Sequence, residues 1–543
     1  MKTTTIDPIT LEVLRHALTA IGEEMNANLV RSAYSPNIKE RRDCSCAVFD
    51  ASGSMVAQAE TIPVHLGAMP ASVAAAMSYR QGLQPGDIIV LNDPYRGGAH
   101  LPDITFVAPV FIEDRIIGFV ANRAHHADIG GKEPGSLAGD SREIFQEGLR
   151  IPPVRLWRAG HVDADVRDLL LLNVRTPEER WGDLRAQFAS CRCGVERFGE
   201  LVDRYGQRVV REGMRAIQDY SERRMRHEIA SLPDGAFAFE DALEGDGLSQ
   251  RPIRIRARVL ITGGDLAVDF DGTDNQTEGP VNAVLAVTQS AVYYAVRAMT
   301  DPTIPPNAGC YRPIRVVAAE GSVVCARPPA PVVGGNLETS QRIVDVVLGC
   351  LGLARPDRLV AASQGTMNNV AIGGVDPRTG CAYTIYETIA GGFGAHTLGD
   401  GVDGMQSHMT NTLNTPIESL ETAYPLRVHC YELAAGSGGS GRHRGGLGIC
   451  RELEALGHEA KVSFLTERRE RGAYGVCGGE PGQPGRNSLM ALSGEISELP
   501  GKGCFVLRSG ERLCIRTPGG GGYGVPSERE LALIDRDQTE GRV

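Results

Sequence analysis

Two strand-like apolar runs, 88–91 and 116–120, lead directly into histidine and aspartate residues, and this pattern constrains the fold more than any other feature of the chain. The first run opens into a glycine-rich loop that carries His100 and Asp103, and the second run opens into His125. Imidazole and carboxylate groups crowded at the ends of neighbouring strands are the donors that a divalent metal site requires. We therefore expect a metal site at one edge of a sheet.

The length and charge of the chain exclude several classes of protein. A chain of 543 residues with 42% hydrophobic and 23% charged residues is too long for one core and predicts about three or four domains. A net charge of -11 argues against nucleic-acid binding, which needs basic surface. No apolar run approaches the ~20 residues of a membrane span, and no signal-peptide pattern is evident. We expect a cytoplasmic protein.

The thirteen cysteines do not suggest a disulfide framework, because their number is odd and they are scattered. Two C-x-C pairs occur, Cys44/Cys46 and Cys191/Cys193, but neither has a partner C-x-x-C pair at a known zinc-site spacing. We expect reduced, mostly buried thiols.

Hydrophobic patterning predicts a mixed α+β, multidomain fold with mixed sheets, flanking helices and a β-rich, glycine-rich C-terminal domain. The expected divisions are an N-terminal α+β region with the metal site (1–164), a helical region (165–232), a central α/β region (233–424) and a β-rich C-terminal region (425–543). We expect the C-terminal glycine clusters to form tight turns. The chain has no G-x-x-x-x-G-K-[ST] phosphate loop, so a nucleotide site within it is not expected.

Several segments, in this order along the chain, resemble the hydantoinase B/5-oxoprolinase family, which is related to the acetone carboxylase-type alpha subunits. The segments that carry the resemblance are 7–13, 62–69, 92–103, 123–131, 143–148, 269–273, 408–412, 414–418 and 517–524. The resemblance implies a partner A subunit that binds ATP and phosphorylates a carbonyl, while the B subunit completes the chemistry. The missing phosphate loop agrees with this division, and a heterotetramer with the A subunit is expected.

The metal ligands of the family carry over to Asp43, His100, Asp103 and His125. Two neutral imidazoles and two carboxylates would balance a divalent cation. Nitrogen and oxygen donors suit zinc, manganese and iron, and zinc is our first choice.

Five neighbouring residues are candidates for other roles. His126, Asp128 and His65 are predicted to act in catalysis, by orienting a ligand ring or moving protons. A buried, hydrogen-bonded core histidine is an equally good interpretation of His126 and His65. Glu143 and Glu147 are candidates for holding polar groups of the substrate, although an exposed loop would explain them as well.

These expectations lead to one main hypothesis and three alternatives. The chain is interpreted as the B subunit of an ATP-dependent cyclic amide hydrolase of the hydantoinase/oxoprolinase type. It would hydrolyse a carbonyl-phosphorylated intermediate with a metal-activated water. The alternatives are a subunit of an ATP-dependent carboxylase of the acetone carboxylase type, a non-catalytic structural partner, and a metal-dependent amidohydrolase without ATP. The motifs do not identify the ring, whether hydantoin, N-methylhydantoin, 5-oxoproline or a larger lactam.

Overall fold

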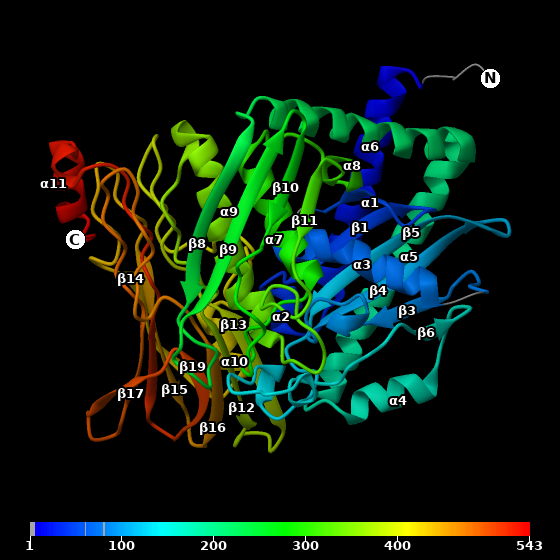
Figure 1. Cartoon of the computed structure of the whole chain (residues 1–543). Helices are drawn as coiled ribbons and strands as arrows, with labels where there is room; N and C mark the ends of the chain where they lie inside the picture. The colour runs from blue at the N-terminus through cyan, green and yellow to red at the C-terminus, as the bar shows by residue number, and fades with distance from the viewer. Residues whose placement is uncertain (1–5, 60, 80–81) are drawn as a thin grey trace.

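The chain folds into four sheets with flanking helices, so the predicted mixed α+β architecture is confirmed. The computed structural model describes residues 6–59, 61–79 and 82–543. The N-terminal sheet (blue and cyan) lies at one side of the molecule and the C-terminal strands (orange) at the other, with the green strands β8 to β11 between them (Figure 1). Among the residues described, no helix combines the length and the apolar character needed to cross a bilayer.

The N-terminal sheet has seven strands in the order β2-β1-β5-β4-β3-β6-β7. These strands are β1 (Cys44–Asp50), β2 (Met55–Gln58), β3 (Ile88–Leu91), β4 (Asp103–Ile112), β5 (Arg115–His125), β6 (Val154–Arg158) and β7 (His161–Val162). The runs at 88–91 and 116–120 are indeed strands, and β4 and β5 form an antiparallel hairpin at the centre of the sheet. Their burial is nearly continuous, because helices cover the sheet on both faces.

Helices α1 and α5 cover one face of this sheet, and α3 packs on the other face. Asp7 caps α1 by accepting hydrogen bonds from the backbone N–H groups of Ile9 and Thr10, and Pro8 stands at the first helical position, where its missing N–H is not needed. The helices of this half are α1 (Pro8–Ser32), α2 (Pro36–Lys39), α3 (Pro63–Tyr79), α4 (Ala164–Leu172), α5 (Pro177–Tyr205) and α6 (Gln207–Ala230).

A second, four-stranded sheet in the order β11-β10-β9-β8 follows the helices. Its elements are β8 (Gly235–Leu243), β9 (Ile253–Thr262), β10 (Asp265–Asp269), β11 (Ile314–Val317), α7 (Leu285–Met299), α8 (Ala308–Tyr311) and α9 (Ser340–Ala354). Alternate residues of β9 are buried against α9 while the others face solvent, which is the period of a half-covered strand. Helix α7 joins this layer to α3: a Cβ atom on Gly67 would lie 2.5 Å from the Cα atom of Ser290, so only glycine permits this close packing.

Two further sheets form the C-terminal part, with orders β13-β12-β16-β19 and β14-β15-β20-β17-β18. The elements are β12 (Asn369–Val375), β13 (Ala382–Thr388), α10 (Ile417–Ala423), β14 (Leu426–Ala434), β15 (Gly448–Ala455), β16 (Ala460–Leu465), β17 (Arg486–Met490), β18 (Ile496–Leu499), β19 (Lys502–Leu507), β20 (Arg512–Arg516) and α11 (Leu531–Thr539). Strands from both sides of residue 425 share the first of these sheets. The four divisions made from sequence stay a prediction.

The glycine clusters of the C-terminal part are used differently from our expectation of tight turns. Most of these glycines have negative φ and lie in extended segments whose backbones pack against one another. The N–H of Gly439 donates to the carbonyl of Gly520, and the N–H of Gly520 donates to that of Gly446. A Cβ atom on Gly520 would lie 2.0 Å from the carbonyl oxygen of Phe393. Close backbone packing, rather than turn geometry, therefore requires glycine here.

All thirteen cysteines are free thiols, as expected, but only five of them are buried. The expectation of mostly buried thiols is wrong because several cysteines, among them Cys430, Cys450 and Cys514, lie on the half-exposed outer face of the last sheet.

Candidate functional site

The hairpin of β4 and β5 brings together two of the predicted ligands. Asp103 begins β4 and His125 ends β5, and the two residues are direct partners in the antiparallel register. The Nδ1 atom of His125 lies 2.9 Å from the Oδ1 atom of Asp103. Both side chains are buried. Asp103 and His125 are 22 residues apart along the chain, and they form a hydrogen bond because a short turn at Glu113 reverses the chain direction.

Asp103 also contacts the predicted catalytic residue His65, which lies on α3. The Nε2 atom of His65 is 3.4 Å from the Oδ2 atom of Asp103, and its Nδ1 atom is 3.0 Å from the hydroxyl of Ser45. The hydroxyl of Thr61 is 2.7 Å from that of Ser45. One carboxylate is thus shared by two imidazoles, and a chain of polar groups runs from it to Thr61.

His100 lies against His125, with their ring centroids 5.2 Å apart. Within the described part of the chain, the buried Nδ1 atom of His100 and the buried Nε2 atom of His125 have no hydrogen-bond partner. On its other side His125 stacks on Tyr386, at 4.5 Å between centroids. Two neighbouring imidazole rings therefore each bury a nitrogen that has no donor or acceptor within the described part of the chain.

Asp43 stands at the start of β1, next to the end of β5. Its backbone carbonyl accepts the N–H of His125 at 3.0 Å, and its side chain is buried. Burial raises the pKa of the Tyr386 hydroxyl well above its ordinary value; the charge of Arg41 opposes this, and the charges of Asp43 and Asp103 add to it. Both carboxylates therefore act on the same aromatic ring that covers His125.

The electrostatics keep an imidazole neutral and a carboxylate ionised at this site. Burial lowers the pKa of His100 to about 3, although Asp103 opposes the shift. Burial raises the pKa of Asp103, but the charges of His65 and His125 and their hydrogen bonds outweigh it and hold this pKa well below its ordinary value. Neutral imidazole and ionised carboxylate are the forms that bind a metal ion.

The four predicted ligands have donor atoms of the types that bind a divalent cation, but these atoms do not form a tight cluster in this structure. Asp103 and His125 bond to each other, which leaves the Nε2 atom of His125 and the Nδ1 atom of His100 as the free nitrogens. A histidine that donates its other ring N–H to a carboxylate is the usual arrangement of a metal-binding histidine. A tight cluster of possible ligands lies elsewhere. Among the described residues, the donor atoms of Cys450, Glu452 and Cys514 all lie within 4.8 Å of one another.

His126 and Asp128 bond to residues outside this group. The Nε2 atom of His126 is 2.9 Å from the side-chain oxygen of Gln187 on α5. Burial, with the charge of Arg180, lowers the pKa of His126 to about 4. The two oxygens of Asp128 accept four hydrogen bonds, from the N–H groups of Gly130, Gly135 and Arg175 and from the Arg175 guanidinium. These contacts favour a structural role for Asp128. The Nδ1 atom of His126 is buried without a partner in the described part of the chain, and the predicted catalytic roles of both residues stay untested.

Glu147 is buried and is held by the chain itself, whereas Glu143 is exposed. The Glu147 carboxylate accepts hydrogen bonds from the hydroxyl of Ser141 and from the backbone N–H groups of Val332 and Val333. Burial raises its pKa to about 7. The exposed loop that we considered for Glu147 is therefore wrong, because residues 332–333 close over it.

Two residues of the site were not predicted from the sequence. Tyr386 covers His125, and Arg41 lies with its guanidinium carbon 5.2 Å from the Tyr386 ring centroid. Arg41 also donates to the carbonyl of Tyr386 at 2.8 Å and to the hydroxyl of Thr388 at 2.8 Å. The arginine stands two residues before Asp43, which was a usable signal; the tyrosine lies in β13, and nothing local marks it.

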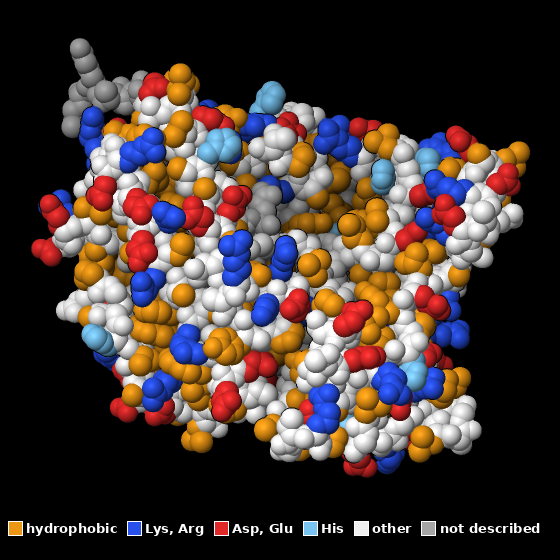
Figure 2. Space-filling model, turned by 180° about the vertical axis from the view of Figure 1, so that it is seen from behind, with side chains coloured by type: hydrophobic (Ala, Val, Ile, Leu, Met, Phe, Trp, Pro, Cys, Tyr) orange, Lys and Arg blue, Asp and Glu red, His pale blue; other side chains and the backbone are white. Residues whose placement is uncertain are grey.

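A cleft of about 710 Å³ approaches the site from the side of α1 and β2. Asn26, Arg42 and Thr61 are among its lining residues. Thr61 also lines an adjoining pocket of about 310 Å³, together with Tyr293, Tyr294 and Asn411. Figure 2 shows the back face of the molecule, which is hollowed near its upper centre with hydrophobic side chains around the hollow. The Thr61 and Ser45 hydroxyls connect this cleft to His65 and Asp103.

Comparison with known proteins identifies the family. The family model described as hydantoinase B/oxoprolinase matches residues 7–526. An uncharacterized protein of Methanocaldococcus jannaschii is 42% identical, over 99% of this chain and 94% of that protein. The 5-oxoprolinase of Dictyostelium discoideum is 36% identical over 96% of this chain, which spans only 41% of that enzyme. A putative B-type D-/L-hydantoinase subunit of a Pseudomonas species is 33% identical, over 99% of this chain and 93% of that protein.

Solved structures agree with this. The chain is similar to the ATP-dependent caprolactamase from Pseudomonas jessenii, with a TM-score of 0.93 and 32% identity, over 99% of this chain and 95% of that one. A nucleotide-free acetone carboxylase structure shares the fold, with a TM-score of 0.90 at 19% identity, over 99% of this chain and 78% of that one. The predicted resemblance is confirmed, and the chain belongs to the hydantoinase B/oxoprolinase family.

Proposed function

We propose that this chain is the B-type subunit of an ATP-dependent cyclic amide hydrolase. The observation that carries the proposal is the buried pair of unpartnered imidazole nitrogens, on His100 and His125, beside the ionised carboxylate of Asp103. Buried polar atoms without partners are costly, so they are retained where a ligand completes them. The names of the relatives, hydantoinase subunit and caprolactamase, support a ring amide as the substrate class.

We propose that Asp43, His100, Asp103 and His125 hold a divalent cation, with zinc as the first choice and manganese or iron as alternatives. Such a cation, when bound, lowers the pKa of a bound water and polarises an oxygen of the substrate. The chain itself supplies the orientation. Asp103 fixes the His125 ring through Nδ1 and so directs Nε2 into the site, while Tyr386 holds the ring from its face.

We propose that protons leave the site along the hydroxyl groups that connect it to the cleft. His65 lies between Asp103 and Ser45, and Ser45 contacts Thr61, which lines the cleft. An imidazole and two hydroxyls can each accept one proton and donate another, so together they can pass a proton over this path. The buried surroundings keep other water away from the reacting group.

The requirement for ATP follows from the chemistry of amides. Resonance makes an amide carbonyl a poor electrophile, and phosphorylation of its oxygen supplies a good leaving group. The chain lacks a phosphate loop and spans about two fifths of the 5-oxoprolinases that it matches. We therefore propose that an A-type subunit binds ATP and phosphorylates the ring carbonyl, that the two assemble as a heterotetramer, and that this chain hydrolyses the phosphorylated ring.

The experiment that tests this function pairs the chain with its ATP-binding partner and measures ring opening of hydantoin, 5-oxoproline and caprolactam. His100→Ala should abolish ring opening and metal binding at this site while the partner still consumes ATP. His161→Ala, at an exposed histidine of β7, is the matched control and should leave both unchanged. Full activity of a His100→Ala complex that holds no metal at this site would refute the proposal. Substrate loss that requires bicarbonate would instead identify a carboxylase.

A further inference from the structure

A second group of metal-binding side chains lies on the outer face of the last sheet, far from the His100 site in the fold. Cys450 and Glu452 are two residues apart on β15 and therefore share one face of the strand. Glu452 is opposite Cys514 on β20 in the antiparallel register. The inward positions of the same strands, such as Leu453 and Leu513, belong to the hydrophobic core of this part.

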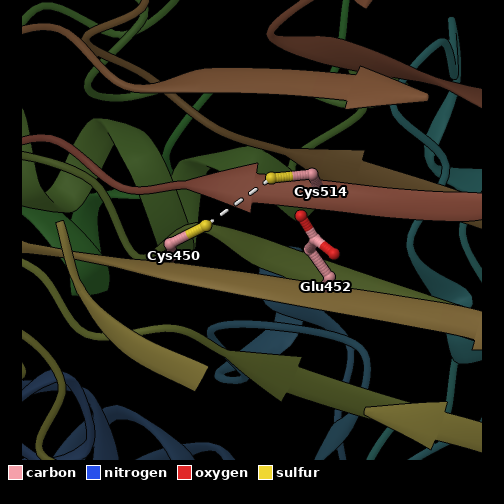
Figure 3. A group of neighbouring side chains, drawn as sticks. All are labelled: Cys450, Glu452 and Cys514. Carbon is pink, nitrogen blue, oxygen red and sulfur yellow. Dashed lines mark hydrogen bonds between the residues drawn. The ribbon is translucent and has the colours of Figure 1, made fainter. Parts of the chain in front are cut away.

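The donor atoms of the three side chains converge. The Sγ atoms of Cys450 and Cys514 are 3.7 Å apart, and the ligand atoms of all three residues lie within 4.8 Å of one another. In Figure 3 the two sulfur atoms point toward each other and a carboxylate oxygen of Glu452 lies beside Cys514. Two thiolates at about 2.3 Å from a tetrahedral zinc ion are about 3.8 Å apart. The sulfur separation is therefore already that of a zinc site.

The surroundings suit an exchangeable cation. All three side chains are half-buried, so an ion can reach them from solvent. In the described part of the chain, the Glu452 carboxylate takes part in no hydrogen bond or ion pair, and so it is available as a ligand.

A disulfide is the competing use of the two cysteines, and the register argues against it. Cys450 is opposite Arg516, not Cys514, so the two cysteines are diagonal neighbours. A disulfide would need the two sulfur atoms about 2.05 Å apart. It would also need the two backbones to be closer together than they are at diagonal positions of a sheet. It would also leave Glu452 without a role.

We propose that Cys450, Glu452 and Cys514 bind one zinc ion that joins β15 to β20, with a water in the fourth position. The two thiols release their protons to solvent as the ion binds. The ion ties together the central strands of the last sheet, so it stabilises this part of the fold. The site is separate from the proposed hydrolytic function and does not depend on it.

The test uses the full chain and Co²⁺ as a spectroscopic substitute for zinc. The wild-type chain should show a thiolate-to-cobalt charge-transfer band, since only cysteine ligands give this signature. Cys450→Ser and Cys514→Ser should lose the band, and Glu452→Gln should weaken it. Cys381→Ser and Cys477→Ser, at exposed cysteines elsewhere, are matched controls and should keep it. His100→Ala should also keep it, which separates this site from the proposed hydrolytic centre.

A stability measurement completes the test. In a His100→Ala background, which removes the other proposed metal site, a free zinc concentration about 100 times Kd should raise the Tm by about 3 °C, and adding Cys450→Ser should abolish this rise. Circular dichroism of Cys450→Ser, and of Cys450→Ala as a second variant, establishes that the fold is kept. A missing cobalt band, a band that survives Cys450→Ser, or a Cys450–Cys514 disulfide in place of metal binding would each overturn the proposal.

Discussion

The two groups of metal-binding side chains differ in where the sheet places them. His100, Asp103 and His125 lie at the buried end of a sheet that is covered on both faces, whereas Cys450, Glu452 and Cys514 lie on the half-exposed face of a sheet that is covered on one. In the first group the carboxylate is hydrogen-bonded to His125 and lies 3.4 Å from the Nε2 atom of His65; in the second the carboxylate is free of such contacts among the described residues. The buried group excludes bulk water from its side chains, while the open group can take up an ion directly from solvent.

The loss of Asp103 should have the largest effect, and it tests the buried side of the comparison. Asp103→Ala removes the partner of His65 and His125 together, so we expect ring opening by the assembled enzyme to fall by about 10³-fold or more. Asp103→Asn keeps the shape of the side chain without its charge and should retain more activity than the alanine variant. Steady-state assays with the partner subunit measure both. Wild-type rates in Asp103→Ala would show that the buried group is not the reaction centre.

The inward face of β15 gives a second test, because it holds a buried charged side chain, as the group around Asp103 does. Arg451 stands between Cys450 and Glu452 but points inward, where its Nη1 atom is 2.5 Å from the Oε2 atom of Glu387 and both side chains are buried. Arg451→Met leaves the Glu387 charge buried without its partner. We expect the free energy of unfolding to fall by about 3–5 kcal/mol. Denaturant unfolding measures it.

The double variant Arg451→Met/Glu387→Leu is the control for this prediction. Removing both charges should restore most of the lost stability, because no unpaired charge stays buried. If Arg451→Met were as stable as the wild type, water would have to solvate the Glu387 carboxylate although this side chain is buried in the structure.

The sequence predicted the buried group because its parts are close along the chain. Asp103 and His125 are separated by one hairpin, and a strand followed by a turn and a second strand has few ways to fold. Their partner Tyr386 could not be predicted, because it lies on a strand of another sheet and approaches His125 only when the N-terminal and C-terminal parts pack together.

The open group was missed for a related reason. Cys450 and Cys514 are 64 residues apart, and only the pairing of β15 with β20 brings their sulfurs together. Local sequence spacing, of the kind that identifies a C-x-x-C pair, cannot predict a group whose members lie on different strands. The close backbone packing at Gly520 is equally invisible, since glycine in a sequence signals a turn and a close approach alike.

Glu147 gives a prediction about pH, because it is a buried carboxyl group without the imidazole partners of Asp103. Burial raises its pKa from the ordinary value of 4.5 to about 7, so the folded chain keeps a proton that the unfolded chain releases between these pH values. Its contribution to stability is therefore fully present below about pH 4.5 and is lost as the pH rises through about 7.

Glu147→Gln should remove this part of the pH dependence, which is on the order of 3 kcal/mol. The measurement is the free energy of unfolding from about pH 4.5 to about pH 8 for both chains. Glu143→Gln, at an exposed neighbour, is the matched control and should behave as the wild type. A wild-type curve that does not fall over this range would mean that Glu147 is ionised when buried, like Asp103.

The smallest expected effect comes from the hydroxyl path between the buried group and the cleft. Ser45→Ala removes the group that joins His65 to Thr61 without touching the proposed ligands. We expect kcat to fall by about 10–100-fold with metal content unchanged, and the loss should deepen as the pH falls, when proton release becomes harder. Ser72→Ala, a buried serine of α3 that bonds to Arg123 and lies off the path, is the matched control. If Ser45→Ala and Ser72→Ala give the same kcat and the same pH profile, protons leave the buried group by another route, and the connection between this site and the cleft is only structural.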